Sequence, residues 1–88
     1  MRIIYPVANA KLWIPRDFDG QLQQVTLRVA HRAKDSRVYW YIDNIYKGTT
    51  ASTHKFVERL THGRHTLEVV DESGNQTQRK FFVSVLKQ

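Results

Sequence analysis

Residues 37–43 read R-V-Y-W-Y-I-D, and this stretch decides how the rest of the chain can fold. In an extended segment, successive side chains point to opposite faces. One face then carries the apolar set Val38, Trp40 and Ile42. A bulky indole between β-branched residues suits a central strand that fills the layer between two sheets. The stretch therefore predicts the middle strand of a small β-sandwich, with Trp40 as its core residue.

The chain has 88 residues, which is room for one domain with one core, so residues 1–88 are expected to form a single β-sandwich domain. Its composition, 41% hydrophobic and 25% charged, is typical of a globular protein. The sequence contains no cysteine, which excludes disulfides and thiol chemistry. The apolar stretch before Pro6 is too short for a signal peptide. Such a chain is either a cytoplasmic protein or a piece of a longer exported one.

Basic residues outnumber acidic ones, giving a formal net charge of +6. They are scattered along every segment, and the one local basic cluster, residues 31–37, is interrupted by Asp35. A basic surface that only keeps a small module in solution explains this scatter better than a nucleic-acid site. No nucleic-acid partner is predicted.

Alternating and short apolar segments predict the remaining strands. The clearest alternation lies in residues 23–30, where Val25, Leu27 and Val29 face inward. The other extended segments are residues 3–5, 11–14, 45–46, 54–60, 65–70 and 76–86. Pro6 and Pro15 end the first two segments, as suits the edges of sheets. Residues 16–21 read as a loop from which Phe18 folds back over the core.

Three turns connect these segments. Asp43-Asn44 tolerates positive φ and predicts a two-residue hairpin. Residues 48–52 read as a second turn. Residues 71–75 read as a tight polar turn in which Asp71 accepts hydrogen bonds from backbone amides.

Turn signals every 8–12 residues, without a helical window, indicate an all-β fold. We predict an immunoglobulin-like antiparallel β-sandwich of about seven strands, held without a disulfide. Trp40 is expected to pack on Leu27 or Val29 from one sheet and on Leu67 or Val69 from the other.

The sequence offers no recognisable catalytic, metal or cofactor site. His62 and His65 flank a turn, but zinc needs further ligands nearby, so both are interpreted as structural. His65 stands where such folds often place a corner tyrosine, and we expect its ring to hydrogen-bond upstream backbone. Ser52 and Lys55 match an S-x-x-K motif of serine enzymes, but that motif needs a helix and Ser52 begins a strand. The match is interpreted as chance.

Exposed aromatic residues are the remaining candidate for function. Tyr39 and Tyr41 share the outer face of the Trp40 strand, Tyr46 lies across the hairpin, and Trp13 is near an edge. These rings could hold sugar rings or a protein partner. Alternatively, they only cover the outer sheet by cross-strand pairing.

With these residues in place, the chain resembles the C-terminal domain of penicillin-binding proteins of the 1C type. The similarity runs over about residues 4–85. It rests on residues 4–6, 14–17 and 20–23, on Trp40-Tyr41-Ile42-Asp43 with Gly48 after it, and on residues 63–67 and 69–75. One departure is Asn44, where the family commonly has glycine, but asparagine can adopt the same turn.

The resemblance implies a C-terminal fragment of a membrane-anchored cell-wall synthase, a glycosyltransferase/transpeptidase whose catalytic residues lie in preceding domains. This module would then be non-catalytic and periplasmic, or otherwise extracytoplasmic, and would meet the membrane only through the parent's anchor. The family supplies no settled role for this last module, and we predict a protein-interaction or positioning role in cell-wall biogenesis, with unidentified envelope proteins as partners. The alternative is a module that binds peptidoglycan or another carbohydrate.

Overall fold

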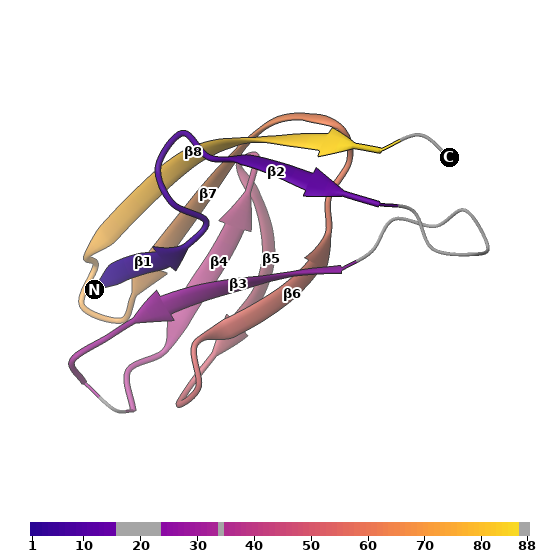
Figure 1. Cartoon of the computed structure of the whole chain (residues 1–88). Helices are drawn as coiled ribbons and strands as arrows, with labels where there is room; N and C mark the ends of the chain where they lie inside the picture. Colours follow the sequence, from indigo (N-terminus) through magenta and orange to yellow (C-terminus); the bar gives the residue numbers. More distant parts are fainter. Residues whose placement is uncertain (16–23, 34, 87–88) are drawn as a thin grey trace.

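The computed structural model describes residues 1–15, 24–33 and 35–86, and every regular element in this part of the chain is a β-strand (Figure 1). The strands are β1 Arg2–Tyr5, β2 Lys11–Ile14, β3 Gln24–Ala30, β4 Val38–Ile42, β5 Ile45–Thr50, β6 Lys55–Arg59, β7 Gly63–Asp71 and β8 Gln76–Val85. No helix of the described residues could cross a membrane. The predicted loop at residues 16–21, with Phe18, lies outside the described residues.

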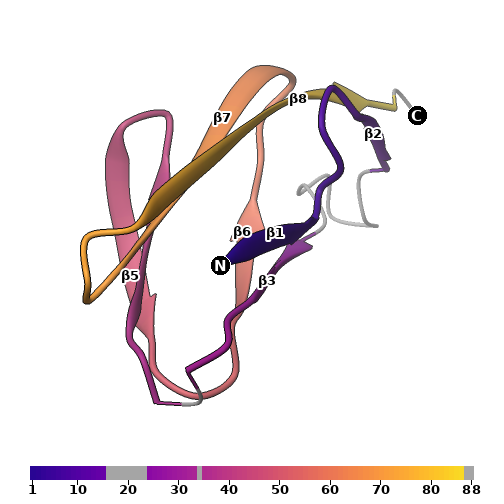
Figure 2. The same ribbon diagram turned by 90° about the vertical axis from the view of Figure 1, so that its left-hand side faces the viewer.

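The strands form two sheets that pack face to face as separate layers (Figure 2). One sheet has the order β1-β3-β6 and the other the order β2-β8-β7-β4-β5. Every pair of neighbouring strands is antiparallel except β2 and β8, which run parallel. The predicted sandwich is therefore confirmed, with this one parallel pair as the departure from an antiparallel arrangement.

The core lies between the layers and consists of apolar side chains from strands of both sheets and from the β6–β7 connection. Its buried members are Ile3, Leu12, Ile14, Val25, Leu27, Val29, Val38, Trp40, Ile42, Leu60, Leu67, Val69, Phe81 and Val83. The inward residues predicted from the alternation of β3 and β4 are all among them. Burial of this set supplies the main driving force for folding.

Trp40 is fully buried at the centre of this core, as predicted. It lies opposite Val69 in the ladder with β7. Its ring stacks on Phe56 of β6, with the ring centroids 5.5 Å apart, and its Nε1 donates a hydrogen bond to Thr50 Oγ1 at 2.9 Å. The partner from the smaller sheet is thus an aromatic ring, opposite Leu27 in the β3–β6 ladder. The sequence had suggested Leu27 itself or Val29.

The predicted turn at residues 48–52 is wrong, because β5 continues through Gly48 to Thr50. Gly48 lies opposite Trp40, and a Cβ atom there would come within 2.8 Å of Phe56 Cε2. The glycine therefore makes space for the ring that stacks on Trp40, and does not bend the chain. The described residues form eight strands where about seven were expected, and β5 is longer than the predicted segment at residues 45–46.

The two other predicted turns are confirmed. Asp43 and Asn44 have φ angles of 54° and 68°, which is the geometry of a tight two-residue hairpin between β4 and β5. Gly74 has a φ of 87° in the turn between β7 and β8, where a side chain would be strained.

Candidate interaction surface

Three of the four predicted aromatic site residues lie together on the outer face of the larger sheet. Tyr39 and Tyr41 project from β4, on the side opposite Trp40, and are half-buried. Tyr46 of β5 lies opposite Tyr41, and the two rings meet edge to face with centroids 5.6 Å apart. A shift of register after Trp40 brings Tyr46 into this position. We call Tyr39, Tyr41 and Tyr46 the tyrosine surface.

The edge strand beside this surface exposes two large apolar side chains. Ile45 is 59% exposed and Tyr46 is 53% exposed. Both side chains belong to β5, the last strand of the larger sheet. Successive side chains of a strand point to opposite faces, so Tyr46 lies with Tyr41 on the outer face, whereas Ile45 lies opposite Ile42 on the inner side of the edge. The next residue of the strand, Lys47, carries the charge that edge strands normally have.

Trp13, the fourth predicted residue, lies at the opposite edge of the same sheet. It projects outward from β2, with β8, β7 and β4 between it and β5. Trp13 is 59% exposed, and the Lys11 ammonium lies 4.6 Å from its ring centroid. The structure therefore divides the predicted site into the tyrosine surface and a separate region around Trp13.

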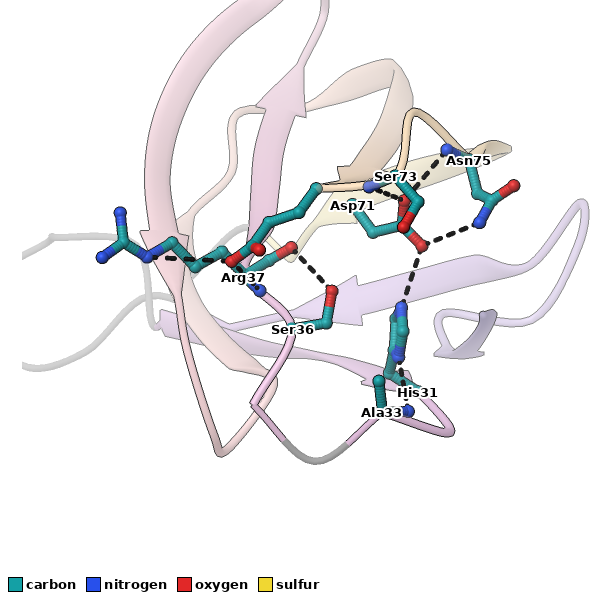
Figure 3. Close-up of polar contacts among 8 residues, drawn as sticks. His31, Ala33, Ser36, Arg37, Asp71, Ser73 and Asn75 are labelled. Carbon is teal, nitrogen blue, oxygen red and sulfur yellow. Dashed lines mark hydrogen bonds and ion pairs between the residues drawn. The ribbon is translucent and has the colours of Figure 1, made fainter.

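Asp71 organises the turn between β7 and β8 (Figure 3). Its carboxylate is only 3% exposed, and Oδ1 accepts hydrogen bonds from the amides of Ser73 and Asn75 at 3.0 and 2.9 Å. Oδ2 accepts from Asn75 Nδ2 and from His31 Nε2. The His31 hydrogen bond above all, helped by the Asn75 and Ser73 donors and opposed by burial, lowers the pKa of Asp71 to about 2. The predicted amide bonds are confirmed, but the role of His31 was not foreseen.

The bonds of His31 define which nitrogen carries its proton. The amide of Ala33 donates to Nδ1 at 2.9 Å, so Nδ1 accepts and Nε2 is the nitrogen that donates to Asp71. Nearby, the Arg37 amide donates to Glu72 Oε1 at 2.9 Å. The basic segment at residues 31–37 is thus bound to two acidic residues of the β7–β8 turn, which offsets part of its charge.

His65 forms a second histidine–aspartate pair at the other end of the sandwich. Its Nδ1 lies 2.6 Å from Asp43 Oδ2 and its Nε2 lies 2.7 Å from the Thr61 carbonyl. Both partners accept, so the two bonds require a proton on each ring nitrogen. Burial alone would raise the pKa of Asp43, but the bonds from His65 and the Thr66 amide lower it overall. The predicted upstream backbone contact of His65 is confirmed.

Thr50 and His54 are the polar side chains that most resemble a catalytic pair, and both form hydrogen bonds inside the fold. Thr50 Oγ1 lies 2.8 Å from His54 Nδ1 and also accepts the Trp40 hydrogen bond. His54 Nε2 is buried without a partner, and burial, together with the nearby His31, lowers the pKa of His54. Within residues 1–15, 24–33 and 35–86, no three histidine, aspartate or glutamate side chains group as metal ligands would. Ser52 lies in the connection between β5 and β6, so the prediction that it begins a strand is wrong, but it is not on a helix either.

This fold and this site define a class: immunoglobulin- and fibronectin-type β-sandwiches that present side chains on an outer sheet face. A solved structure of the same shape is described as "Structures of Clostridium thermocellum CbhA fibronectin(III)-like modules", with a TM-score of 0.72 and 15% sequence identity over 98% of each chain. That likeness establishes the fold alone. No curated protein matches the chain.

The chain belongs to the Penicillin-Binding Protein C-terminus Family, whose model matches residues 1–81. The match covers the tyrosine surface, both histidine–aspartate pairs and the region around Trp13. The resemblance seen in the sequence is confirmed at the level of this family, and the 1C type stays a prediction.

Proposed function

We propose that the chain is a non-catalytic C-terminal module of a penicillin-binding peptidoglycan synthase, and that it positions this enzyme by binding another protein of the cell envelope. Membership of the family supports the link to cell-wall synthesis. The parent enzyme in this proposal is anchored in the membrane, so the module works in the periplasm or another extracytoplasmic space. The observation that carries the proposal is the tyrosine surface on β4 and the edge strand β5.

Side chains of this kind are suited to a protein interface. Tyrosine combines a large apolar ring with a polar end, loses little conformational entropy on binding, and is enriched at the centres of interfaces. The exposed half of Tyr46 contributes little to the core. Burying this area under a partner would therefore stabilise a complex without any cost to the fold.

The placement of the polar groups supports a non-catalytic role. A catalytic site needs a nucleophile, a base and space for substrate between them. Asp71 instead accepts the amide of Ser73 in the β7–β8 turn, and Asp43 accepts the amide of Thr66 in β7. Each carboxylate is also hydrogen-bonded to a histidine. His54 and Thr50 are enclosed next to Trp40.

Direct binding of peptidoglycan is a second candidate function, and the exposure of Trp13 favours it. An exposed indole can stack on a sugar ring. If this function is right, titration with soluble muropeptides should shift the amide resonances around Trp13 and Tyr41. A titration that leaves these resonances unchanged removes this candidate.

Affinity capture from envelope extract tests the main proposal. The chain, the double variant Tyr41→Ala/Tyr46→Ala and a control Arg28→Ala/Lys55→Ala would be immobilised at equal density. Arg28 and Lys55 are neighbours on the outer face of the smaller sheet. We expect a discrete set of proteins to be retained by the chain and by the control, and to be lost from the tyrosine variant. An unchanged set of proteins on the tyrosine variant contradicts the proposal.

A further inference from the structure

The parallel pairing of β2 with β8 brings together two parts of the sequence that contain no acidic residue. Neither residues 1–15 nor residues 73–86 include an aspartate or a glutamate. Lys11 lies directly opposite Phe82 in the β2–β8 ladder. The acid-free ends of the chain, far apart in sequence, thereby form one side of the larger sheet.

Strand β7, the other neighbour of β8, places a second cation, Arg64, beside Phe82. Arg64 lies opposite Phe82 on the other side, so the ring is flanked by Lys11 and Arg64 on the outer face. Lys80 precedes Phe82 by two residues and therefore shares its face. We call Lys11, Trp13, Arg64, Lys80 and Phe82 the cationic surface.

The charges of this surface are not neutralised within the described part of the chain. Lys11, Arg64 and Lys80 are exposed, and none of them forms an ion pair with a described acidic residue. The ammonium of Lys11 instead contacts two rings, at 4.6 Å from the Trp13 centroid and 5.6 Å from the Phe82 centroid. A hollow of about 560 Å³ adjoins the surface, and its lining includes Arg64, Lys80 and Phe82.

We propose that the cationic surface binds an extended acidic segment of a partner protein, at a site separate from the tyrosine surface. Charge complementarity selects the acidic side chains, and the rings of Trp13 and Phe82 supply apolar contact between them. The two surfaces use different strands, because the cationic surface lies on β2, β8 and the first half of β7, whereas the tyrosine surface lies on β4 and β5. Arg64 lies beyond the residues of β7 that pair with β4, and Glu68 is the residue of β7 opposite Tyr41.

Two features favour a protein segment over other anionic partners. Lys11 covers one face of the Trp13 ring, so a sugar could stack only on the other face. The next residue on the outer face of β7 after Thr66 is Glu68, so the cations do not continue into the long track that a nucleic-acid backbone requires. A tryptophan, a phenylalanine and an arginine beside lysines are instead the composition of a protein-binding centre with a charged rim.

The experiment is a nuclear magnetic resonance titration of the ¹⁵N-labelled chain. The probes are a capped peptide in which glutamate alternates with phenylalanine, the matched peptide with glutamine for glutamate, soluble muropeptides and a DNA oligonucleotide. We expect the glutamate peptide alone to shift the amides of β2, β8 and the first half of β7. The dissociation constant should rise with salt concentration. No shifts with the glutamate peptide up to about 1 mM, or equal shifts with the glutamine peptide, would overturn the proposal. So would shifts that occur only with muropeptides or DNA.

Two double variants with the same change in net charge test whether binding depends on the cationic surface or only on the overall charge of the chain. Arg64→Glu/Lys80→Glu reverses two exposed cations of the cationic surface, and Arg28→Glu/Lys55→Glu reverses two on the smaller sheet, with the same change in net charge. We expect the first pair to weaken peptide binding at least about tenfold and the second pair to weaken it less than about threefold. Equal losses would overturn the proposal. Loss of capture by the Tyr41→Ala/Tyr46→Ala variant alone would leave this site untouched, so the two proposals fail separately.

Discussion

The inner and outer faces of β4 carry the same kind of bulky residue for different purposes. On the inner face, Trp40 is fully buried between the sheets and its only polar atom is hydrogen-bonded to Thr50. On the outer face, Tyr41 is half-buried and meets Tyr46 at an exposed edge strand. The inner ring is required by packing, whereas we propose that the outer rings serve binding. Stability and binding should therefore respond separately to substitutions on the two faces.

The largest expected effect is on the inner face, from Trp40→Ala. This substitution removes the stack on Phe56 and leaves a cavity between the sheets. We expect the free energy of unfolding to fall by about 3–5 kcal/mol, which could unfold much of a domain with marginal stability. Urea unfolding followed by far-ultraviolet circular dichroism measures the loss. A loss below about 1 kcal/mol would show that the ring does not support both layers.

The next largest effect on stability is expected at Gly48, on strand β5. Gly48→Ala places a Cβ atom 2.8 Å from Phe56 Cε2 and pushes that ring out of its stack with Trp40. We expect a loss of about 1–3 kcal/mol in the free energy of unfolding. Gln78→Ala, at an exposed position of β8, is the control and should change it by less than about 0.5 kcal/mol. Equal effects at the two positions would contradict the inward role of Gly48.

A smaller effect is expected from the Asp71 carboxylate, and it depends on pH. The pKa of Asp71 in the folded chain is about 2, below its ordinary value of 3.8, so ionised Asp71 favours the folded state. This contribution is complete above pH 4 and is lost progressively as the pH falls toward 2. In Asp71→Asn, the unfolding free energy should vary less with pH in this window, as measured by urea unfolding at a series of pH values. A variant with the unchanged pH dependence would contradict this assignment.

The smallest effect on stability is expected on the outer face. Tyr46→Ala removes an exposed ring, one edge-to-face contact and an exposed hydrogen bond between the hydroxyls of Tyr46 and Thr49, so it should cost about 1 kcal/mol. Thermal unfolding of the variant beside Trp40→Ala provides the measurement. If Tyr46→Ala destabilises the chain as much as Trp40→Ala does, the outer tyrosines are structural, and the reason for proposing a binding surface there disappears.

The alternation of apolar and polar residues was enough to predict which side chains of β3 and β4 face the core. Val25, Leu27 and Val29 repeat at two-residue spacing, as do the apolar residues of β4, and this local pattern identifies both strands and the core. The turns at Asp43-Asn44 and Asp71 were also predictable, because their chemistry acts within a few residues.

Contacts between distant parts of the chain could not be predicted in this way. His31 and Asp71 are 40 positions apart, and only the packing of the sheets brings them together. The prediction of a turn at Gly48 was wrong because the absence of a side chain there makes space for Phe56 of the other sheet. The residues around Gly48 in the sequence give no sign of this distant contact. The parallel pairing of β2 with β8 separates Trp13 from the tyrosines and creates the cationic surface, and it is likewise a result of topology.

Site-specific photo-crosslinking in the native envelope tests the central claim most directly. A benzophenone amino acid would replace Tyr46 on the outer face of the larger sheet or, as the matched control, Lys55 on the outer face of the smaller one. We predict discrete protein adducts from position 46 and none of these adducts from position 55. The same adducts from both positions, or none from position 46, would contradict a binding surface at the tyrosines.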